Sequence, residues 1–278
     1  MNTSNRQQYP VNLCQPDAIK SCGACCGLYN WENHLRVTLE SLLRRRTELF
    51  FSLEKPPDLE KYSRACETLP SSPKLCETIY NCEFLGFVDK ELKQVGCLLH
   101  PSLHNSVDLR TCSFYGANLC AEHFCPSFNH LTTVEQEAVI MSLDDWYLYG
   151  LVITDIDFVK EFFRHVQDRL GDSVHVDRIR NSKARQALHE FFTLKENWNF
   201  LSKENKLGKY YFSHSEYLIA RIEYEKNWGM KPSRFDKIFV SLSSVFKTKD
   251  DVSEAEAIIE EKIIGFIESY NLVDPIPL

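Results

Sequence analysis

The segment SCGACCG, residues 21–27, places three cysteines within seven positions. Cysteine thiolates are favoured ligands of zinc and of iron–sulfur clusters. The spacing Cys22-x-x-Cys25 lets two sulfur atoms face one metal while the backbone between them turns. Cys26 follows directly, and the side chains of adjacent residues tend to diverge. The segment therefore predicts either one ligand beside a bystander or two metal centres that share a loop.

The glycines and backbone amides of this segment favour the same interpretation. We expect Gly23 and Gly27 to allow the turn, because glycine adopts positive φ angles without a Cβ penalty. Backbone N–H groups in such a loop can donate hydrogen bonds to the sulfur atoms and stabilise their negative charge.

A second set of potential ligands lies between residues 82 and 125, where His100, His104 and His123 are interleaved with cysteines. A His-Pro pair in a loop commonly marks a turn, so we favour that interpretation over ligation for the first two histidines. The predicted metal ligands of both sets are Cys22, Cys25, Cys26, Cys82, Cys97, Cys112, Cys120 and Cys125. These eight thiols build either two four-ligand sites or one site with spare buried cysteines.

Cysteine usage along the chain argues for metal rather than for disulfides. All 11 cysteines lie between residues 14 and 125, and none occurs in the 153 residues that follow. The count is odd, and the polar N-terminus lacks the apolar segment of a secretory signal. We therefore expect a cytoplasmic protein whose thiols stay reduced. The remaining cysteines, Cys14, Cys66 and Cys76, are predicted to be buried free thiols.

Composition narrows the class of partner. The 278 residues carry a formal net charge of −7, which disfavours non-specific binding to nucleic acid. The basic run 44–46 is interpreted as the solvated face of a helix, with a nucleic-acid or partner patch as the alternative. No apolar run approaches the ~18 residues that a membrane span needs. The expected partners are a metal ion or cluster and an electron-transfer or other protein, with neither nucleic acid nor membrane.

Hydrophobic periodicity indicates the elements that position the cysteines. Apolar residues recur at helical spacing over 34–54 and 59–69, and prolines after each stretch end the helix. Residues 80–100 hold two short apolar runs around a polar segment, which predicts a β-hairpin. This hairpin is expected to bring Cys82 and Cys97 into one neighbourhood.

Beyond a segment at 101–130 that we expect to be dominated by loops, helical patterns replace the cysteines. One helix is predicted over 154–171, with Thr154 or Asp155 as its N-cap and Gly171 as its C-terminal stop. Further helical patterns cover 180–198, 213–228, 233–246 and 253–272. The histidines of this half are predicted to be surface or packing residues; they are His165, His175, His189 and His214.

The last predicted helix carries a capping box, in which Glu256 follows Ser253 after three residues. The predicted fold class is α+β. A small cysteine-rich metal-binding domain with a β-hairpin and helices covers residues 1–130. An all-α helical domain covers residues 131–278.

The residues Cys22-Gly23-Ala24-Cys25-Cys26-Gly27 resemble the CxxCxxCC motif of a family of zinc- or iron-chelating cysteine-cluster proteins. Downstream, CEFLGFVD…VGCLLHPS…DLRTCSFYG…FCPS is similar to the later part of that domain, so the resemblance covers about residues 14–128. The first cysteine of the motif corresponds to Ile19, so Cys14 replaces it from further away or that ligand is lost. The resemblance implies a divergent member that chelates metal. Relatives by this resemblance include flagellin lysine methylases thought to use an iron–sulfur centre. We do not transfer that activity, because the chain has no recognisable cofactor-binding motif for it.

Three functions remain open on the sequence. Excess thiols with irregular spacing favour an iron–sulfur protein with a redox or enzymatic role. The alternative is a structural zinc domain in a protein-interaction module, although such domains usually have two CxxC knuckles and this chain has one. The third is a protein with free cysteines and no metal. No GxGxxG, P-loop, HExxH or GxSxG motif occurs, so no catalytic residue is assigned.

Overall fold

A computed structural model describes residues 12–54, 56–202, 209–211, 216–218 and 221–272. The first half contains the 3-10 helix η1 (Ala24–Cys26), α1 (Arg36–Phe51), α2 (Leu59–Glu67), β1 (Leu85–Phe87), β2 (Val95–Cys97), η2 (Pro101–Leu103), η3 (Arg110–Cys112), α3 (Gly116–Glu122) and α4 (Pro126–His130). The second half contains α5 (Thr133–Ser142), α6 (Trp146–Ile153), α7 (Ile156–Leu170), α8 (Val176–Ile179), α9 (Ser182–Phe192), α10 (Leu194–Asn197), β3 (Lys209–Tyr211), β4 (Glu216–Leu218), α11 (Tyr224–Trp228), α12 (Asp236–Ser241) and α13 (Lys249–Asn271).

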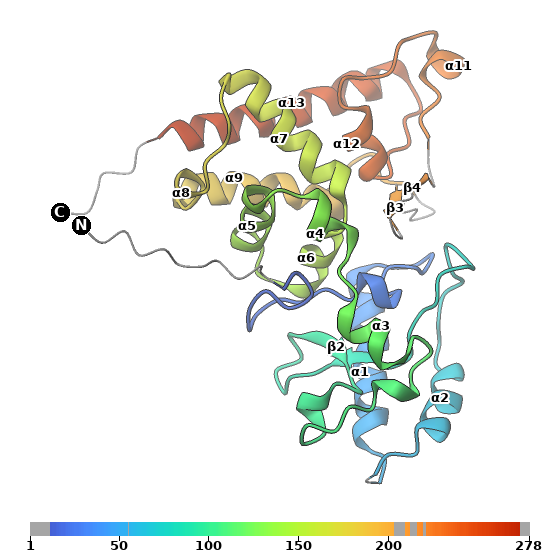
Figure 1. The fold of residues 1–278 in the computed structure, drawn as a ribbon. Helices are drawn as coiled ribbons and strands as arrows, with labels where there is room; N and C mark the ends of the chain where they lie inside the picture. Colours follow the sequence, from blue (N-terminus) through green and yellow to red (C-terminus); the bar gives the residue numbers. More distant parts are fainter. Residues whose placement is uncertain (1–11, 55, 203–208, 212–215, 219–220, 273–278) are drawn as a thin grey trace, which may run out of the picture.

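The described chain is mostly helical, with two antiparallel sheets of two strands each. Figure 1 shows α1–α3 and the β1–β2 hairpin at one end of the molecule and the long helices α7, α9 and α13 at the other. No helix among the described residues is long and apolar enough to span a membrane.

The predicted helices and hairpin of the first half are present. Helix α1 buries Leu39, Leu43 and Phe50 along one face, as its periodicity indicates. The adjoining hairpin pairs β1 with β2 in antiparallel register. Its first strand is tied to α1 because the backbone amide of Phe87 donates to the Thr47 hydroxyl at 2.7 Å. The hairpin is therefore held in a fixed position against α1.

The segment at 101–130 has more local structure than expected. Four short helices, η2, η3, α3 and α4, interrupt the loop that the sequence predicts. None exceeds seven residues, and proline opens two of them, at Pro101 and Pro126. Proline fits the first turn of a helix because its missing N–H would have no partner there.

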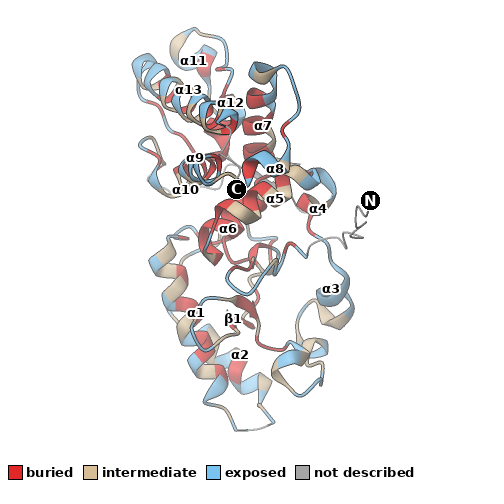
Figure 2. Ribbon diagram, turned by 90° about the vertical axis from the view of Figure 1, so that its left-hand side faces the viewer, coloured by how far each residue is buried: buried red, intermediate tan, exposed pale blue. Residues whose placement is uncertain are grey.

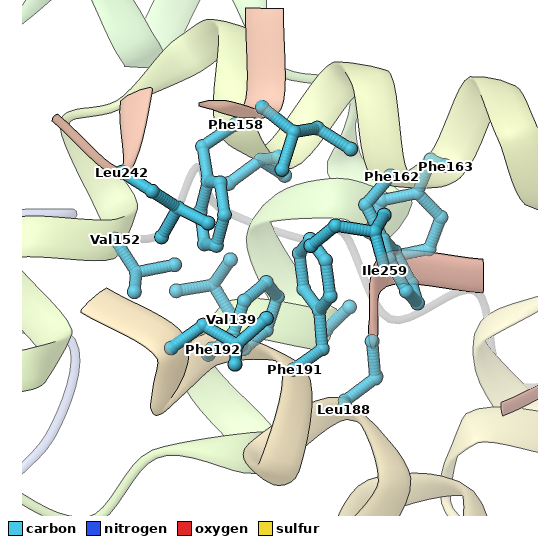
Figure 3. Close-up of a cluster of buried hydrophobic side chains, with 14 of the residues drawn as sticks. Val139, Val152, Phe158, Phe162, Phe163, Leu188, Phe191, Phe192, Leu242 and Ile259 are labelled. Carbon is cyan, nitrogen blue, oxygen red and sulfur yellow. The ribbon is translucent and has the colours of Figure 1, made fainter. Parts of the chain in front are cut away.

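Aromatic packing holds the helical half together. Phe158 and Phe162 of α7 each lie against the Phe191 ring of α9, with ring centroids 4.7 and 4.3 Å apart. Figure 3 shows these rings converging with Phe192 and Ile259 in a single cluster. The predicted ends of α7 are confirmed in the side chain of Asp155, which caps its first turn, and in the left-handed Gly171 that follows it.

The second half departs from the all-helical prediction. Strands β3 and β4 pair in antiparallel register, and β4 lies within 213–228, where the sequence predicts a helix. Both strands fall in short stretches rich in tyrosine, a residue that favours strands, and three residues are too few to reveal a period of two. His214 lies outside the described residues.

The predicted capping box of the last helix is also wrong. Helix α13 begins at Lys249, and its box is formed by Thr248 and Asp251. Ser253 lies inside the first turns, where its hydroxyl donates to the Lys249 carbonyl at 3.3 Å. The Thr-x-x-Asp pattern of Thr248 and Asp251 begins five residues before Ser253 and caps the helix there. The helix starts at this earlier point because its apolar face extends back to Val252.

Helix α6 joins the two ends of the molecule. All eight of its residues are buried, and they contribute to hydrophobic clusters on both sides of it (Figure 2). The Tyr29 hydroxyl, from the loop that follows η1, donates to the carbonyl of Tyr147 at 3.0 Å. Arg36 at the start of α1 also pairs with Asp145 and Glu196 at 2.8 and 2.7 Å. Hydrophobic packing is continuous across residue 130, because Cys125 and Leu131 belong to the same cluster. The domain boundary expected there stays a prediction.

Candidate metal centres

All 11 cysteines are free thiols. By the influence of their charges on one another, eight of them associate in two adjoining groups of four. The members are neighbours, because the charge of a deprotonated sulfur in a group raises the pKa of others in the same group. The first thiol group consists of Cys14, Cys22, Cys25 and Cys125. The second thiol group consists of Cys26, Cys82, Cys97 and Cys120.

The loop that supplies both groups turns through the short helix η1. Gly27 ends this helix in the left-handed conformation, with φ +80°, and a Cβ there would lie 2.5 Å from the Tyr80 carbonyl oxygen. This position accordingly requires glycine. Gly23 does not have the positive φ that we expected; its φ is −118°. A small residue is needed at Gly23 for a steric reason instead, because a Cβ would lie 2.9 Å from the Leu85 side chain.

The helical turn of η1 separates the adjacent thiols of Cys25 and Cys26. A 3-10 helix has about three residues per turn, so consecutive side chains point about 120° apart. Cys22 precedes η1, and the charge of Cys25 raises its pKa, so both belong to the first thiol group. Cys25 and Cys26 therefore point to different sides of the turn, although the charge of Cys25 still raises the pKa of Cys26. Which of the two interpretations of the pair holds stays a prediction.

Distant segments of the chain meet at the first thiol group. The backbone amide of Cys22 donates to the carbonyl of Cys14 at 2.8 Å. Cys125 is part of the hydrophobic cluster of the helical half, and Cys22 packs against that cluster. The hydroxyl of Tyr149 in α6 donates to the carbonyl of Leu13 at 2.9 Å. The group is therefore anchored to the helical half of the protein.

The second thiol group is built on the hairpin. The backbone amide of Cys82 donates to the carbonyl of Cys26 at 2.9 Å. Cys97 is the last residue of β2, and both Cys26 and Cys97 pack against the cluster that contains Cys82. Cys120 comes from α3, and its sulfur lies 3.5 Å from the Ser113 hydroxyl. The predicted proximity of Cys82 and Cys97 is thereby confirmed.

Burial dominates the pKa values of these thiols. Desolvation, followed by the charge of Cys125, raises the pKa of Cys14 to about 11. Desolvation also raises the pKa of Cys82 to about 12, with the charges of Glu83 and Cys97 adding to the shift. Desolvation likewise raises the pKa values of Cys22, Cys25, Cys26, Cys97 and Cys125. A bound metal would have to displace the protons of these thiols.

The structure groups the cysteines differently from the predicted ligand set at two positions. Cys14, assigned as a buried free thiol, is an exposed residue of the first thiol group. Cys112, assigned as a ligand, lies at the exposed end of η3, where its sulfur is 3.9 Å from the Thr111 hydroxyl. The next cysteine after Cys97 that belongs to the second thiol group is Cys120, in α3. The other seven assigned ligands fall into the two groups.

The remaining cysteines and histidines have other partners. Cys76 is half-buried, with its sulfur 3.1 Å from the Thr78 hydroxyl, and Cys66 packs against the cluster under α2. His104 donates through Nε2 to the carbonyl of Leu98 at 2.7 Å. Cys66 and Cys76 are thus half-buried, not buried as predicted, and all three side chains have structural contacts.

Sequence reasoning missed two residues beside the thiols. Tyr149 is fully buried, and burial followed by the charges of Cys22 and Cys125 raises its pKa. Arg46 is 7 % exposed, whereas we expected the run 44–46 to face solvent. The signal was present, because Arg46 shares the apolar face of α1 with Leu39, Leu43 and Phe50.

Among the described residues, no three His, Cys, Asp or Glu side chains are placed so that they could hold a metal ion. Each thiol group is thus a set of neighbouring sulfurs rather than a formed coordination shell. No protein-family model, curated protein or solved structure matches this chain.

Proposed function

We propose that this protein binds two metal centres through cysteine thiolates, one in each thiol group. The observation that supports the proposal is the gathering of eight thiols into two adjoining groups of four, which meet where the charge of Cys25 raises the pKa of the adjacent Cys26. Four thiolates complete the coordination of a zinc ion or of an iron–sulfur cluster. Side chains must close around the metal, so binding is coupled to local folding.

Iron–sulfur clusters are the centres that we favour. Both groups consist of thiols alone, which is the usual ligand set of [2Fe–2S] and [4Fe–4S] clusters. Zinc sites draw on histidine as well, and His100 and His104 are engaged by Ser102 and the Leu98 carbonyl instead. A single zinc ion, with Zn–S bonds of about 2.3 Å, would also require its four sulfurs to approach one another more closely than a cluster does.

The role that we propose is redox or cluster-dependent chemistry in a reducing compartment such as the cytoplasm. An electron-transfer protein is the expected partner. Structural zinc in a protein-interaction module is the second candidate, since four thiolates also suit zinc. We further propose that the chain is a divergent member of the cysteine-cluster family, on the strength of residues 22–27.

Anaerobic purification followed by metal analysis and a visible spectrum tests the proposal. Two clusters per chain predict iron with acid-labile sulfide and thiolate-to-iron absorption in the visible range. Zinc without visible absorption would select the second candidate. A preparation that takes up neither metal after reconstitution with iron and sulfide, or with zinc, would overturn both.

Serine variants supply matched controls within the chain. Cys25→Ser is expected to lose the first centre and Cys26→Ser the second, each leaving about half of the metal. Cys66→Ser is expected to retain both, because Cys66 lies outside the two groups. Equal and complete loss from the two adjacent variants would indicate one shared centre instead of two.

A further inference from the structure

A cavity of about 330 Å³ lies between the two halves of the protein. Its wall combines the start of α1 with parts of α6 and α10 and with the residues that end α12. The volume falls within the range of about 300–1,000 Å³ that is typical of small-molecule sites, which often lie between domains. Among the described residues that line it there is no cysteine, so the cavity shares no residue with either thiol group.

Apolar and aromatic side chains form half of the cavity wall. They are Leu35, Val37, Tyr147, Leu151, Leu201 and Leu242. Leu35 and Val37 are 48 % and 72 % exposed, whereas Tyr147, Leu151 and Leu242 are buried. A ligand with an apolar body would remove part of this surface from water, which favours binding.

The charged side chains of the wall already have partners within the protein. Arg36 donates from Nε and Nη2 to Glu196 at 2.9 and 2.7 Å, and from Nη1 to Asp145 at 2.8 Å. Lys195 pairs with Asp155, and both of these side chains are buried. A charged ligand would compete with these pairs, and breaking a buried ion pair is strongly unfavourable. The wall therefore favours an uncharged ligand.

His34 supplies the cavity wall with a hydrogen-bond acceptor. Its Nδ1 lies 2.8 Å from the Trp31 carbonyl oxygen, which can only accept, so the proton of the neutral ring is on Nδ1 and Nε2 has a lone pair. Burial, followed by the charge of Lys195, lowers the pKa of this imidazole, so the ring is neutral at pH 7. The backbone is held as well, because the Tyr147 hydroxyl donates to the His34 carbonyl at 2.8 Å.

The Nε2 atom of His34 has no hydrogen-bond partner in the described part of the chain. It is not sealed inside the protein either, since the fully buried side-chain atoms without a partner are Arg46 Nε and the Tyr224 hydroxyl oxygen. The side chain is 6 % exposed and lines the cavity. The lone pair is therefore accessible from the cavity.

We propose that this cavity binds a small uncharged molecule that has an apolar body and one hydroxyl or N–H group, whose hydrogen His34 Nε2 accepts. The leucine side chains supply the hydrophobic contact, and the imidazole fixes the orientation. Contacts with Trp31 and Tyr147 already hold His34 in place, so binding requires little further ordering. Binding at this cavity does not depend on the metal centres.

Phenol, anisole and benzoate are suitable probes, each titrated into the full chain at pH 7 and followed by NMR. All three contain a benzene ring, but phenol alone is an uncharged donor. We expect phenol to bind with a Kd of about 1 mM, as ligands of this size do, and to shift the resonance of His34 Nε2. Anisole should bind at least about tenfold more weakly, because it leaves the acceptor without a partner, and benzoate should not bind.

Three results would overturn the proposal. Equal affinity for phenol and anisole would remove the role of the donor. Tighter binding of benzoate would show that a cation of the wall is the anchor. The absence of any shift with all three probes at millimolar concentration would show that the cavity is not a ligand site.

Two phenylalanine variants test His34 directly. His34→Phe keeps an aromatic ring and removes the acceptor, so its affinity for phenol should fall to that of anisole. His189→Phe is the matched control, because the Nδ1 of His189 lies 2.9 Å from the Ser142 carbonyl oxygen but the residue does not line the cavity; it should bind phenol as wild type does. Unchanged phenol affinity in folded His34→Phe would overturn the proposal, and the comparison of probes on the wild-type chain holds however either variant folds.

Discussion

The carbonyl of Cys26 accepts a hydrogen bond from the backbone amide of Cys82 at 2.9 Å. This contact joins the SCGACCG loop to the residue that precedes the hairpin, across more than fifty positions of sequence. The carbonyl of the preceding turn, at Gly23, accepts from the Cys26 amide itself. Backbone pairing thereby fixes Cys26 on the hairpin side of the loop, while Cys25 stays with the first thiol group.

The division between the groups predicts separable losses. Cys82→Ser should empty the second thiol group and Cys125→Ser the first, with each variant retaining about half of the bound metal. The reason is that each serine leaves three thiolates at one centre and four at the other. Metal analysis of the two variants, together with the double variant, measures this. Complete loss in either single variant would contradict two independent centres.

Two exposed cysteines, Cys14 inside the first thiol group and Cys112 outside both groups, can be compared directly. Cys14→Ser should remove metal from the first thiol group, whereas Cys112→Ser should leave the metal content at the wild-type level. Both residues are exposed, but the Cys14 sulfur is desolvated beside Cys125. Iron or zinc per chain, with protein determined by amino-acid analysis, is the measurement. The reverse result would restore the ligand set expected from the sequence.

A glycine in α6 tests the junction between the two halves. A Cβ on Gly150 would lie 2.1 Å from the Tyr29 hydroxyl oxygen, so Gly150→Ala should destabilise the protein by about 1–3 kcal/mol despite the better helix propensity of alanine. Urea unfolding followed by circular dichroism measures the change. The matched control is Gly265→Ala in α13, where a Cβ meets nothing within 4 Å and alanine should stabilise by about 0.5–1 kcal/mol. Tyr29→Phe should recover part of the loss in the double variant.

The buried imidazole of His34 allows a prediction of how the free energy of unfolding depends on pH. Burial, followed by the charge of Lys195, lowers the pKa of this imidazole, whose Nδ1 lies 2.8 Å from the Trp31 carbonyl oxygen. Below the ordinary value of 6.5 the unfolded chain binds a proton that the folded protein resists, so stability falls as the pH decreases and is unaffected above that value. The slope between pH 7 and pH 5, measured by urea unfolding of the metal-free protein, should be shallower in His34→Gln. Parallel profiles would show that another group is responsible.

Long periodic elements were predictable, and short ones were not. Helices α1 and α7 and the β1–β2 hairpin follow from apolar spacing and from residues such as Asp155 and Gly171 at their ends. Strands β3 and β4 have three residues each, which leaves no pattern long enough to distinguish a strand from a helix.

The thiol groups could be predicted only in part. Cysteine type and count pointed to metal, but spacing along the chain does not report distance in space. The Cys22 amide binds the Cys14 carbonyl and brings Cys14 beside the first thiol group. The resemblance to the motif offered Cys14 only as one of two alternatives, because its distance along the chain from Cys22 is not the motif's spacing. Arg46 was predictable in principle, because the helical period places it on the buried face of α1. Treating the three arginines as one surface patch hid that difference.

The composition of the first thiol group has a consequence for biosynthesis. Three of its members lie within the first 25 residues, and the fourth, Cys125, is translated one hundred residues after Cys25. Because domains of a nascent chain form in the order of synthesis, the loop must leave the ribosome with its thiols unsatisfied. The second group, whose last member is Cys120, is completed only slightly earlier. If the two groups bind metal as proposed, neither is complete on a short nascent chain, and we expect metal insertion to follow the emergence of α4.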